Sequence, residues 1–190
     1  MAETRKWWQD YSRQRIDFEK TLPKDTPFRE KVLAALDAQH ISYRLVEHPA
    51  VYTIEEMQAL GWPEEQMRCV CKNLFLRNAN GKQHFLVVLR EDKRADLKAL
   101  RSELGSTALS FASEERLMNC LGLTKGAVTP LGILNDDAFA VTVAFDRDLV
   151  GAPCLGVHPC DNTASVFLSY EDLKAVIERH GNRLLTVNIS

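Results

Sequence analysis

Phe85-Leu86-Val87-Val88-Leu89 is an uninterrupted apolar run, the pattern of a β-strand that is buried on both faces. Another strand pattern, from Asn73 to Arg77, comes just before it. Between the two lies Asn80-Gly81, a strong short signal for a hairpin turn. The sequence therefore predicts a hairpin of two strands, 73–77 and 84–89, at the β-rich centre of the fold.

Helices and strands follow one another irregularly on both sides of this hairpin. Helices are predicted at 5–20, from an N-cap at Thr26 with Pro27 in the first position, at 53–60, 95–104, 113–121 and 169–181. Strands are predicted at 41–47, 140–146, 155–158, 163–168 and 184–189, and a loop at 124–132. Because this order lacks a regular βαβ spacing, we expect a mixed α/β domain and not a doubly wound one.

The N-terminal residues are expected to form a region of their own. They carry an imperfect apolar helical stripe, and a proline-rich break from Leu22 to Pro27 follows it. We therefore expect a helical appendage over residues 1–22 and one main domain over residues 23–190.

Composition is ordinary for a globular protein, with 45% hydrophobic and 26% charged residues. No apolar run approaches the roughly 20 residues that span a bilayer, and the N-terminus lacks the apolar centre of a signal peptide. We expect a cytoplasmic monomer whose five cysteines are free thiols. The net charge of −2 argues against strong non-specific nucleic-acid binding, so an RNA partner would need a local basic patch. The run Lys93, Arg94, Lys98 and Arg101 is either such a patch or a solvated helix face.

Lys72 and Asn73 are the first candidate site residues. A lysine that enters a buried strand either extends to the surface or faces a polar cavity, where its three donors suit a carbonyl, a ribose hydroxyl or a phosphate. In a regular strand Asn73 points to the opposite face, so only a bulge or a strand end brings both into one site.

The glycine-rich stretch from Gly126 to Gly132, with Pro130 inside it, is the second candidate. Its exposed backbone N–H groups suit an ester oxyanion, and the alternative is a plain connecting loop. It lacks the Gly-Lys-Ser/Thr ending of a phosphate-binding loop.

His158, followed by Pro159 and by Asn162, is the third candidate. The histidine suits acid/base chemistry or substrate binding, whereas the polar residues after it also suit a simple turn. Cys160 with His158 is a weaker alternative, a thiol-based catalytic pair. The cysteine spacing disfavours zinc, because no Cys-x-x-Cys pair is present.

Four segments together are more specific than any of them alone: Cys71-Lys72-Asn73-Leu74-Phe75-Leu76, Leu109 to Leu117, Gly126-x-x-x-Pro130-x-Gly132 and His158-Pro159-x-x-Asn162-Thr163. In this order the chain resembles the YbaK/ProX family of prolyl-tRNA-synthetase-associated editing domains, and most of all its free-standing PrdX or ProXp-ala type. The resemblance runs from about residue 25 to about residue 183. It implies a central mixed, barrel-like β-sheet flanked by helices.

The resemblance also implies an activity, hydrolysis of the ester of a mischarged tRNA for proline without metal or cofactor. It places the family's lysine on Lys72, its glycine loop on Gly126 and Pro130, and its histidine on His158. We expect Lys72 to hold the substrate, the backbone from Gly126 to Gly132 to stabilise the oxyanion, and His158, Asn73 and Asn162 to position substrate for attack by water.

Alanine is the first-choice amino acid, while serine, cysteine and threonine remain open. A prolyl-tRNA synthetase or an elongation factor is the expected protein partner. Two other functions remain open: a non-catalytic module that binds an aminoacyl or nucleotide ligand, and a cysteine-dependent hydrolase of small esters.

Overall fold

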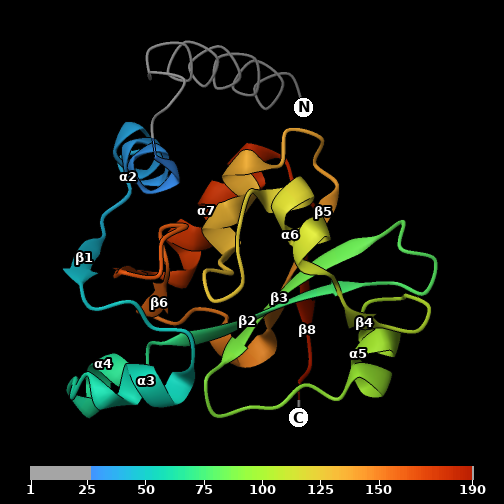
Figure 1. Cartoon of the computed structure of the whole chain (residues 1–190), viewed down its shortest axis with the longest axis horizontal. Coiled ribbons are helices and arrows are strands. Elements are labelled where there is room, and N and C mark those ends of the chain that lie inside the picture. Colours follow the sequence, from blue (N-terminus) through green and yellow to red (C-terminus); the bar gives the residue numbers. More distant parts are fainter. Residues whose placement is uncertain (1–26, 190) are drawn as a thin grey trace.

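The computed structural model describes residues 27–189 (Figure 1). The predicted 1–22 appendage and the predicted N-cap Thr26 lie outside the described residues. Within them, no helix combines the length and the apolar character that a membrane crossing requires.

The predicted hairpin is confirmed. β2 (Cys71–Arg77) pairs antiparallel with β3 (His84–Arg90) in an unbroken register. The connection over residues 78–83 is longer than a two-residue turn. Oδ1 of Asn78 closes it by accepting hydrogen bonds from the backbone N–H groups of Lys82 and Gln83.

Two sheets share the structure. The five-stranded sheet has the order β4-β2-β3-β5-β8, where β4 is Ser110–Phe111, β5 is Val141–Asp146 and β8 is Leu184–Val187. β5 runs parallel to both of its neighbours, β3 and β8. The three-stranded sheet, antiparallel throughout, has the order β1-β7-β6, with bounds Arg44–Glu47, Ala164–Leu168 and Leu155–Val157.

A parallel bridge between Val70 and Gly156 joins the two sheets. The mixed α/β fold is confirmed. The expected barrel-like sheet takes the form of two sheets that meet at this bridge.

Burial of β3 on both faces is also confirmed, since Phe85 to Leu89 are each at most 4% exposed. Alternate residues of β3 enter two different apolar clusters. The first core receives Leu86 and Val88, and the second core receives Phe85, Val87 and Leu89. Burial of each such side chain contributes roughly 1.5–3 kcal/mol, so β3 is the strand around which both cores form.

Helices cover these two cores. α2 (Phe28–Ala38), α6 (Glu114–Leu121) and α7 (Tyr170–His180) contribute to the first core, and α5 (Leu97–Glu103) to the second (Figure 1). α3 (Ile54–Ala59) and the short α4 (Glu64–Met67) contribute to a third, smaller cluster around Val51, Met57 and Val70.

Local capping signals were reliable guides to several helix ends. Oγ1 of Thr53 accepts a hydrogen bond from the N–H of Glu56 at 3.2 Å, as the predicted capping pattern requires. Gly122, with a left-handed φ of +65°, ends α6 as predicted. The start of α2 differs: Pro27 occupies the cap position and the helix begins at Phe28.

The predicted loop at 124–132 is partly wrong. Its second half is the start of a 3-10 helix, η1 (Pro130–Asn135). Thr129 is the N-cap, and its hydroxyl accepts from the N–H of Leu131. A threonine followed by proline is itself a helix-start signal, which explains the difference.

Candidate active site

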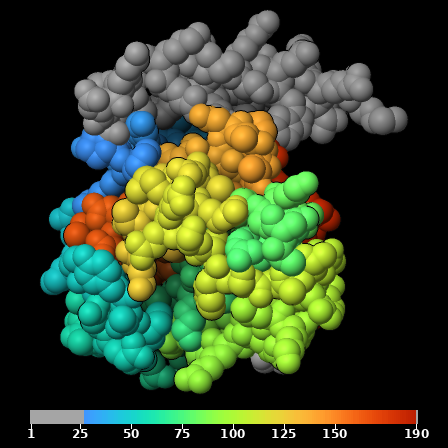
Figure 2. All heavy atoms as spheres, turned by 45° about the vertical axis from the view of Figure 1, so that its right-hand side comes forward, coloured from blue at the N-terminus to red at the C-terminus, as the bar shows by residue number. Residues whose placement is uncertain are grey.

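β2 has a neighbouring strand along its full length on one side but only near its ends on the other. β4 pairs with Leu76 and Arg77, and Val70, just before β2, bridges to Gly156. Among the described residues no strand pairs with this side at positions 71–74, which we call the open edge of β2. In Figure 2 the dark green atoms of this part of the chain lie in a recess between the teal atoms around α3 and the yellow-gold atoms of the loop after α6.

Lys72 lies at the open edge and is partly buried. Its Nζ donates a hydrogen bond to the backbone oxygen of Lys93 at 3.0 Å, and within the described chain the other two N–H groups remain for a ligand. The pKa of Glu55, at the start of α3, is lowered by hydrogen bonds with its own backbone and with Thr53, and also by the charge of Lys72. The lysine is therefore anchored beside α3 instead of extending freely into solvent.

Asn73 points to the opposite face of β2. Its register with β3 is regular, with Asn73 opposite Val88, so successive side chains alternate in direction. The Asn73 side faces the first core and the Lys72 side faces the second core. Oδ1 of Asn73 is buried and has no hydrogen-bond partner in the part of the chain that the structure describes. A ligand that contacts both residues must lie across the open edge.

The loop after α6 approaches the residues that precede α3. Gly126 has a left-handed φ of +91°, and a Cβ at this position would lie 2.5 Å from Cδ1 of Tyr52. Glycine is therefore required both for the backbone conformation and for the close approach. The Tyr52 side chain is exposed at 63%, so its ring forms part of the surface beside the loop.

The backbone N–H groups of this loop differ in whether they already donate a hydrogen bond within the protein. Those of Leu131 and Gly132 donate to the hydroxyl and the carbonyl of Thr129, at 3.3 and 3.1 Å. Those of Gly126 and Val128 donate to no group among the described residues. The set of oxyanion donors expected from the sequence is thus narrowed to the first half of the loop.

Pro130 and Gly132 have structural roles inside η1. Both are buried. A Cβ on Gly132 would lie 2.6 Å from Cδ1 of Leu123, so glycine at this position permits close packing. These two residues shape the loop, and the structure does not present them to a ligand.

Thr129 joins the loop to the His158 segment. Its side chain is fully buried, and its hydroxyl donates to the backbone oxygen of His158 at 2.6 Å. Because the same hydroxyl caps η1, the position of the loop and the position of His158 depend on one side chain.

The His158 imidazole is held in one orientation. Its Nδ1 lies 2.9 Å from the backbone oxygen of Ala164, which can only accept, so Nδ1 carries the proton and Nε2 is left as an acceptor. Burial lowers the pKa of His158, and the nearby His48 lowers it further, against the opposing effects of Ala164 and Asp161. The ring is therefore neutral at pH 7.

A single segment, residues 48–52, connects the residues that follow His158 with the glycine loop at Gly126. The N–H of His48 donates to Thr163 at 2.9 Å and the N–H of Val51 donates to Asn162 at 3.2 Å. Tyr52, the last residue of the segment, lies against Gly126. Asn162 thus holds this segment through its carbonyl. Oδ1 of Asp161 accepts hydrogen bonds from the N–H and the hydroxyl of Thr163, which is the turn that the sequence left open as an alternative.

The structure therefore brings Gly126, His158 and Asn162 together and places Lys72 and Asn73 on either side of the open edge. The residues that connect them were not predicted from the sequence. These are His48, Tyr52 and Thr129, of which only Thr129 carried a usable signal, its position before a proline.

The cysteines do not form a reactive centre. All five are free thiols, as predicted. Burial raises the pKa of Cys160 to about 12, so its thiol is protonated at pH 7. No group of three or more His, Cys, Asp or Glu side chains suited to a metal ion occurs in the described part of the chain.

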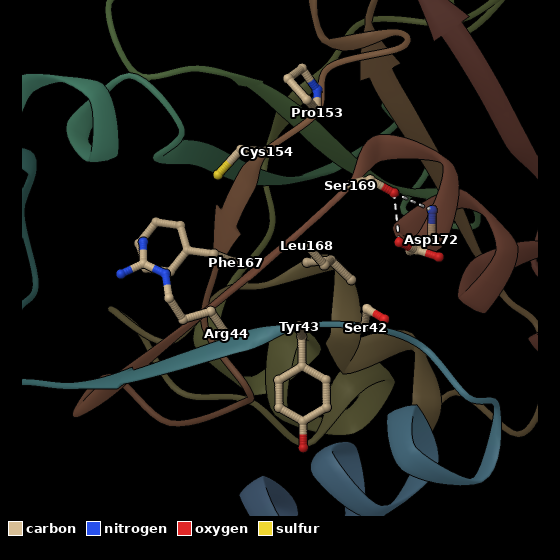
Figure 3. Close-up of a pocket in the computed structure, with 9 residues that line it drawn as sticks. All are labelled: Ser42, Tyr43, Arg44, Pro153, Cys154, Phe167, Leu168, Ser169 and Asp172. Carbon is tan, nitrogen blue, oxygen red and sulfur yellow. Dashed lines mark hydrogen bonds between the residues drawn. The ribbon is translucent and has the colours of Figure 1, made fainter.

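A pocket of about 420 Å³ lies elsewhere, between β1, β7 and the residues before β6 (Figure 3). Four of its polar side chains already have partners. Ser169 and Asp172 are engaged in the cap of α7, Tyr43 donates to Asp37, and Arg44 donates to Gln66. None of the candidate site residues lines it, so it is not the expected site.

The fold and the sequence both have known relatives. A solved structure described as a proposed trans-editing enzyme for prolyl tRNA synthetase superposes with a TM-score of 0.63 at 23% identity, over 87% of this chain and 99% of that one. The prolyl-tRNA editing protein ProX of Acetoanaerobium sticklandii is 50% identical over 87% of this chain and 99% of its own length. Prolyl-tRNA synthetase associated domain-containing protein 1 of Danio rerio is 33% identical over 79% of this chain and 81% of its own.

The structural match shows that the two proteins share this mixed α/β fold. Residues 48–176 match the family described as the aminoacyl-tRNA editing domain, and the chain belongs to that family. The expected family and the expected enzyme class, an aminoacyl-tRNA deacylase, are confirmed.

The orientation of His158 gives a first prediction. In long-range ¹H–¹⁵N spectra its ring should show the Nδ1–H tautomer, and its pKa should lie below 6.5, because Ala164 accepts from Nδ1 and burial disfavours the charged form. The Nε2–H tautomer at neutral pH would contradict the geometry.

The close approach of Gly126 to Tyr52 gives a second prediction. Gly126→Ala should lower kcat/KM for deacylation by roughly 100-fold, because the loop or the Tyr52 ring beside it must shift and reacting groups tolerate little displacement. The matched control is Gly105→Ala, at φ +59° with nothing within 4 Å of the added Cβ. Both variants should lose about 1 kcal/mol or more of unfolding free energy from backbone strain, but only the first should lose activity. Equal activity of the two variants would remove the loop from the site.

Proposed function

We propose that this protein is a free-standing editing enzyme that hydrolyses the aminoacyl ester of mischarged tRNA for proline, with alanine as the preferred amino acid. The observation that carries the proposal is the meeting of the glycine loop and the His158 segment at Thr129. It occurs in a chain 50% identical, over almost the full length of the relative, to a protein named for prolyl-tRNA editing. The reaction would place the enzyme in the cytoplasm.

The substrate would lie across the open edge of β2. From the second-core side, the two remaining N–H groups of Lys72 would bind the terminal adenosine or the ester carbonyl. From the first-core side, Oδ1 of Asn73, which has no partner in the described chain, would accept a hydrogen bond from the substrate. An unpaired buried oxygen is costly, and a substrate hydroxyl or ammonium group would satisfy it.

Water would attack the ester carbon, and the amides of Gly126 and Val128 would stabilise the negative charge that develops on the carbonyl oxygen. His158, neutral and with Nε2 free to accept, would orient the α-ammonium group or a ribose hydroxyl. No carboxylate is assigned as a general base. Since an aminoacyl ester is already reactive, positioning would supply much of the rate.

Editing fits the selectivity problem that alanine presents. A synthetase pocket built for proline excludes a smaller amino acid only weakly, because a missing methylene changes binding by about 1–3 kcal/mol. A second site that admits alanine and excludes proline solves this problem. Tyr52, whose ring lies against Gly126, would limit the size of the amino acid.

The tRNA body would contact α5 and the turn before it. Arg94, Lys98 and Arg101 are exposed there, and the bond from Lys72 to the backbone of Lys93 puts this region next to the open edge. Three such charges give modest affinity, so a synthetase or an elongation factor would assist delivery.

The structure disfavours a cysteine-dependent hydrolase. Cys160 is partly buried, burial raises its pKa to about 12, and Nδ1 of His158 is engaged with Ala164. A non-catalytic binding module would share the same recess and would differ only in turnover.

Incubation with a panel of tRNAs for proline, charged with alanine, serine, cysteine, threonine or proline, tests the proposal. Alanine should be released fastest and proline should be retained. Lys72→Ala should lower kcat/KM by roughly 100-fold, the scale of losing one pre-organised donor to a developing charge. Lys82→Ala, at an exposed lysine in the connection between β2 and β3, is the control and should change kcat/KM less than threefold. Full activity of Lys72→Ala would refute the site, and inertness toward the whole panel would refute the enzyme.

A further inference from the structure

Lys93 belongs to the run that the sequence left open as a basic patch or a solvated helix face, but its ammonium group is held by contacts within the protein. Nζ lies 2.8 Å from Oδ2 of Asp146, 2.7 Å from Oδ2 of Asp148 and 2.6 Å from the backbone oxygen of Ile189. The two carboxylate contacts are ion pairs and the contact with Ile189 is a hydrogen bond, so three oxygens surround the ammonium group. Lys93 is therefore not available to bind a phosphate.

The same residue holds Lys72 through its backbone. The carbonyl oxygen of Lys93 accepts the hydrogen bond from Nζ of Lys72 at 3.0 Å. Lys93 thus connects the open edge of β2 with the end of β5 and with the C-terminal strand region. We define the Lys93 cluster as Lys93, Asp146, Asp148 and the carbonyl of Ile189.

We propose that Lys93 is a positioning residue: its side chain fixes the turn after β3, so that its carbonyl holds the Lys72 ammonium group at the open edge. This inference rests on the proposed function, because it assigns a role in deacylation to a contact of Lys72.

The flexible side chain of Lys72 must be held in one position to bind substrate productively. A free lysine carries about 2 kcal/mol of rotamer entropy, so an unanchored Lys72 would occupy many positions besides the productive one. A fixed acceptor removes part of this cost before substrate binds. The acceptor is itself in a turn between β3 and α5, and turns of this kind move unless other contacts hold them.

The cluster has the strength to hold that turn. Asp146 is 1% exposed, and a buried carboxylate requires a partner. Burial alone would lower the pKa of Lys93, but the hydrogen bonds with Asp146 and Asp148 outweigh it and raise the pKa. Asp148, by contrast, is 52% exposed, so it can be changed without leaving a buried charge unpaired.

A double-mutant cycle between Lys93 and Lys72 tests the proposal, with deacylation of alanyl-tRNA for proline as the readout. Lys93→Met should lower kcat/KM about tenfold in the wild-type background and less than twofold in the Lys72→Ala background, because its effect passes through Lys72. Lys174→Met is the matched control, since Lys174 forms ion pairs with Glu171 and Glu178 on α7. It should have no effect in either background.

If Lys93→Met does not fold, Asp148 replaces Lys93 in the double-mutant cycle, because changing Asp148 leaves no buried charge unpaired. Asp148→Asn should lower kcat/KM about threefold, and Asp148→Glu should restore most of it, a rescue that loss of stability alone does not predict. All assays are run well below the melting temperature of each variant.

The outcomes separate the two proposals. If Lys72→Ala lowers activity but the Lys93 effect is equally large in both backgrounds, the positioning role is refuted and the proposed function stands. If Lys72→Ala has no effect, the proposed site itself fails. A decrease in the salt dependence of KM in Lys93→Met would show that Lys93 binds phosphate, and this would also refute the positioning role.

Discussion

Burial of β3 on both faces is the constraint on which the rest of the structure depends. A strand in this position needs an apolar core on each side, and the two cores assign opposite directions to the neighbouring residues of β2. Lys72 and Asn73 therefore cannot share one face. In the proposed site one substrate reaches both residues across the other edge of β2, which lacks a partner strand in the described chain at positions 71–74.

The site is assembled from segments that are distant in sequence, and short hydrogen bonds hold them. Thr129 fixes the glycine loop to the His158 segment, and the residues at 48–52 connect that segment to Gly126. Burial leaves His158 neutral with one free acceptor. Such an arrangement suits an ester, which needs orientation and charge stabilisation more than a strong base.

Local features of the fold could be predicted from the sequence because local physics determines them. The apolar run at 85–89, the cap at Thr53 and the C-terminal glycine at Gly122 each act within a few residues. The start of η1 at Pro130 was missed, although Thr129 before a proline is a signal of the same kind. β4, two residues long, has no pattern of its own and forms because Leu76 and Arg77 offer it an edge.

The site residues were predicted by resemblance, but their contacts could not be. Nothing in the sequence near Lys93 indicates that its ammonium group pairs with Asp146, more than 50 positions away, instead of belonging to a surface patch. Likewise, the donors of Gly132 and Gly126 look equivalent in sequence, and only the fold shows that one is used inside η1. Long-range pairing decides these roles.

The central claim is that substrate lies across the open edge of β2. An NMR titration with a non-hydrolysable amide analogue of 3′-alanyl-adenosine tests it directly. The account predicts amide shift changes at Lys72, Asn73, Gly126 and Val128, with little change around Arg44 and Cys154 in the separate pocket. Shift changes confined to that pocket, with none at the open edge, would contradict the account.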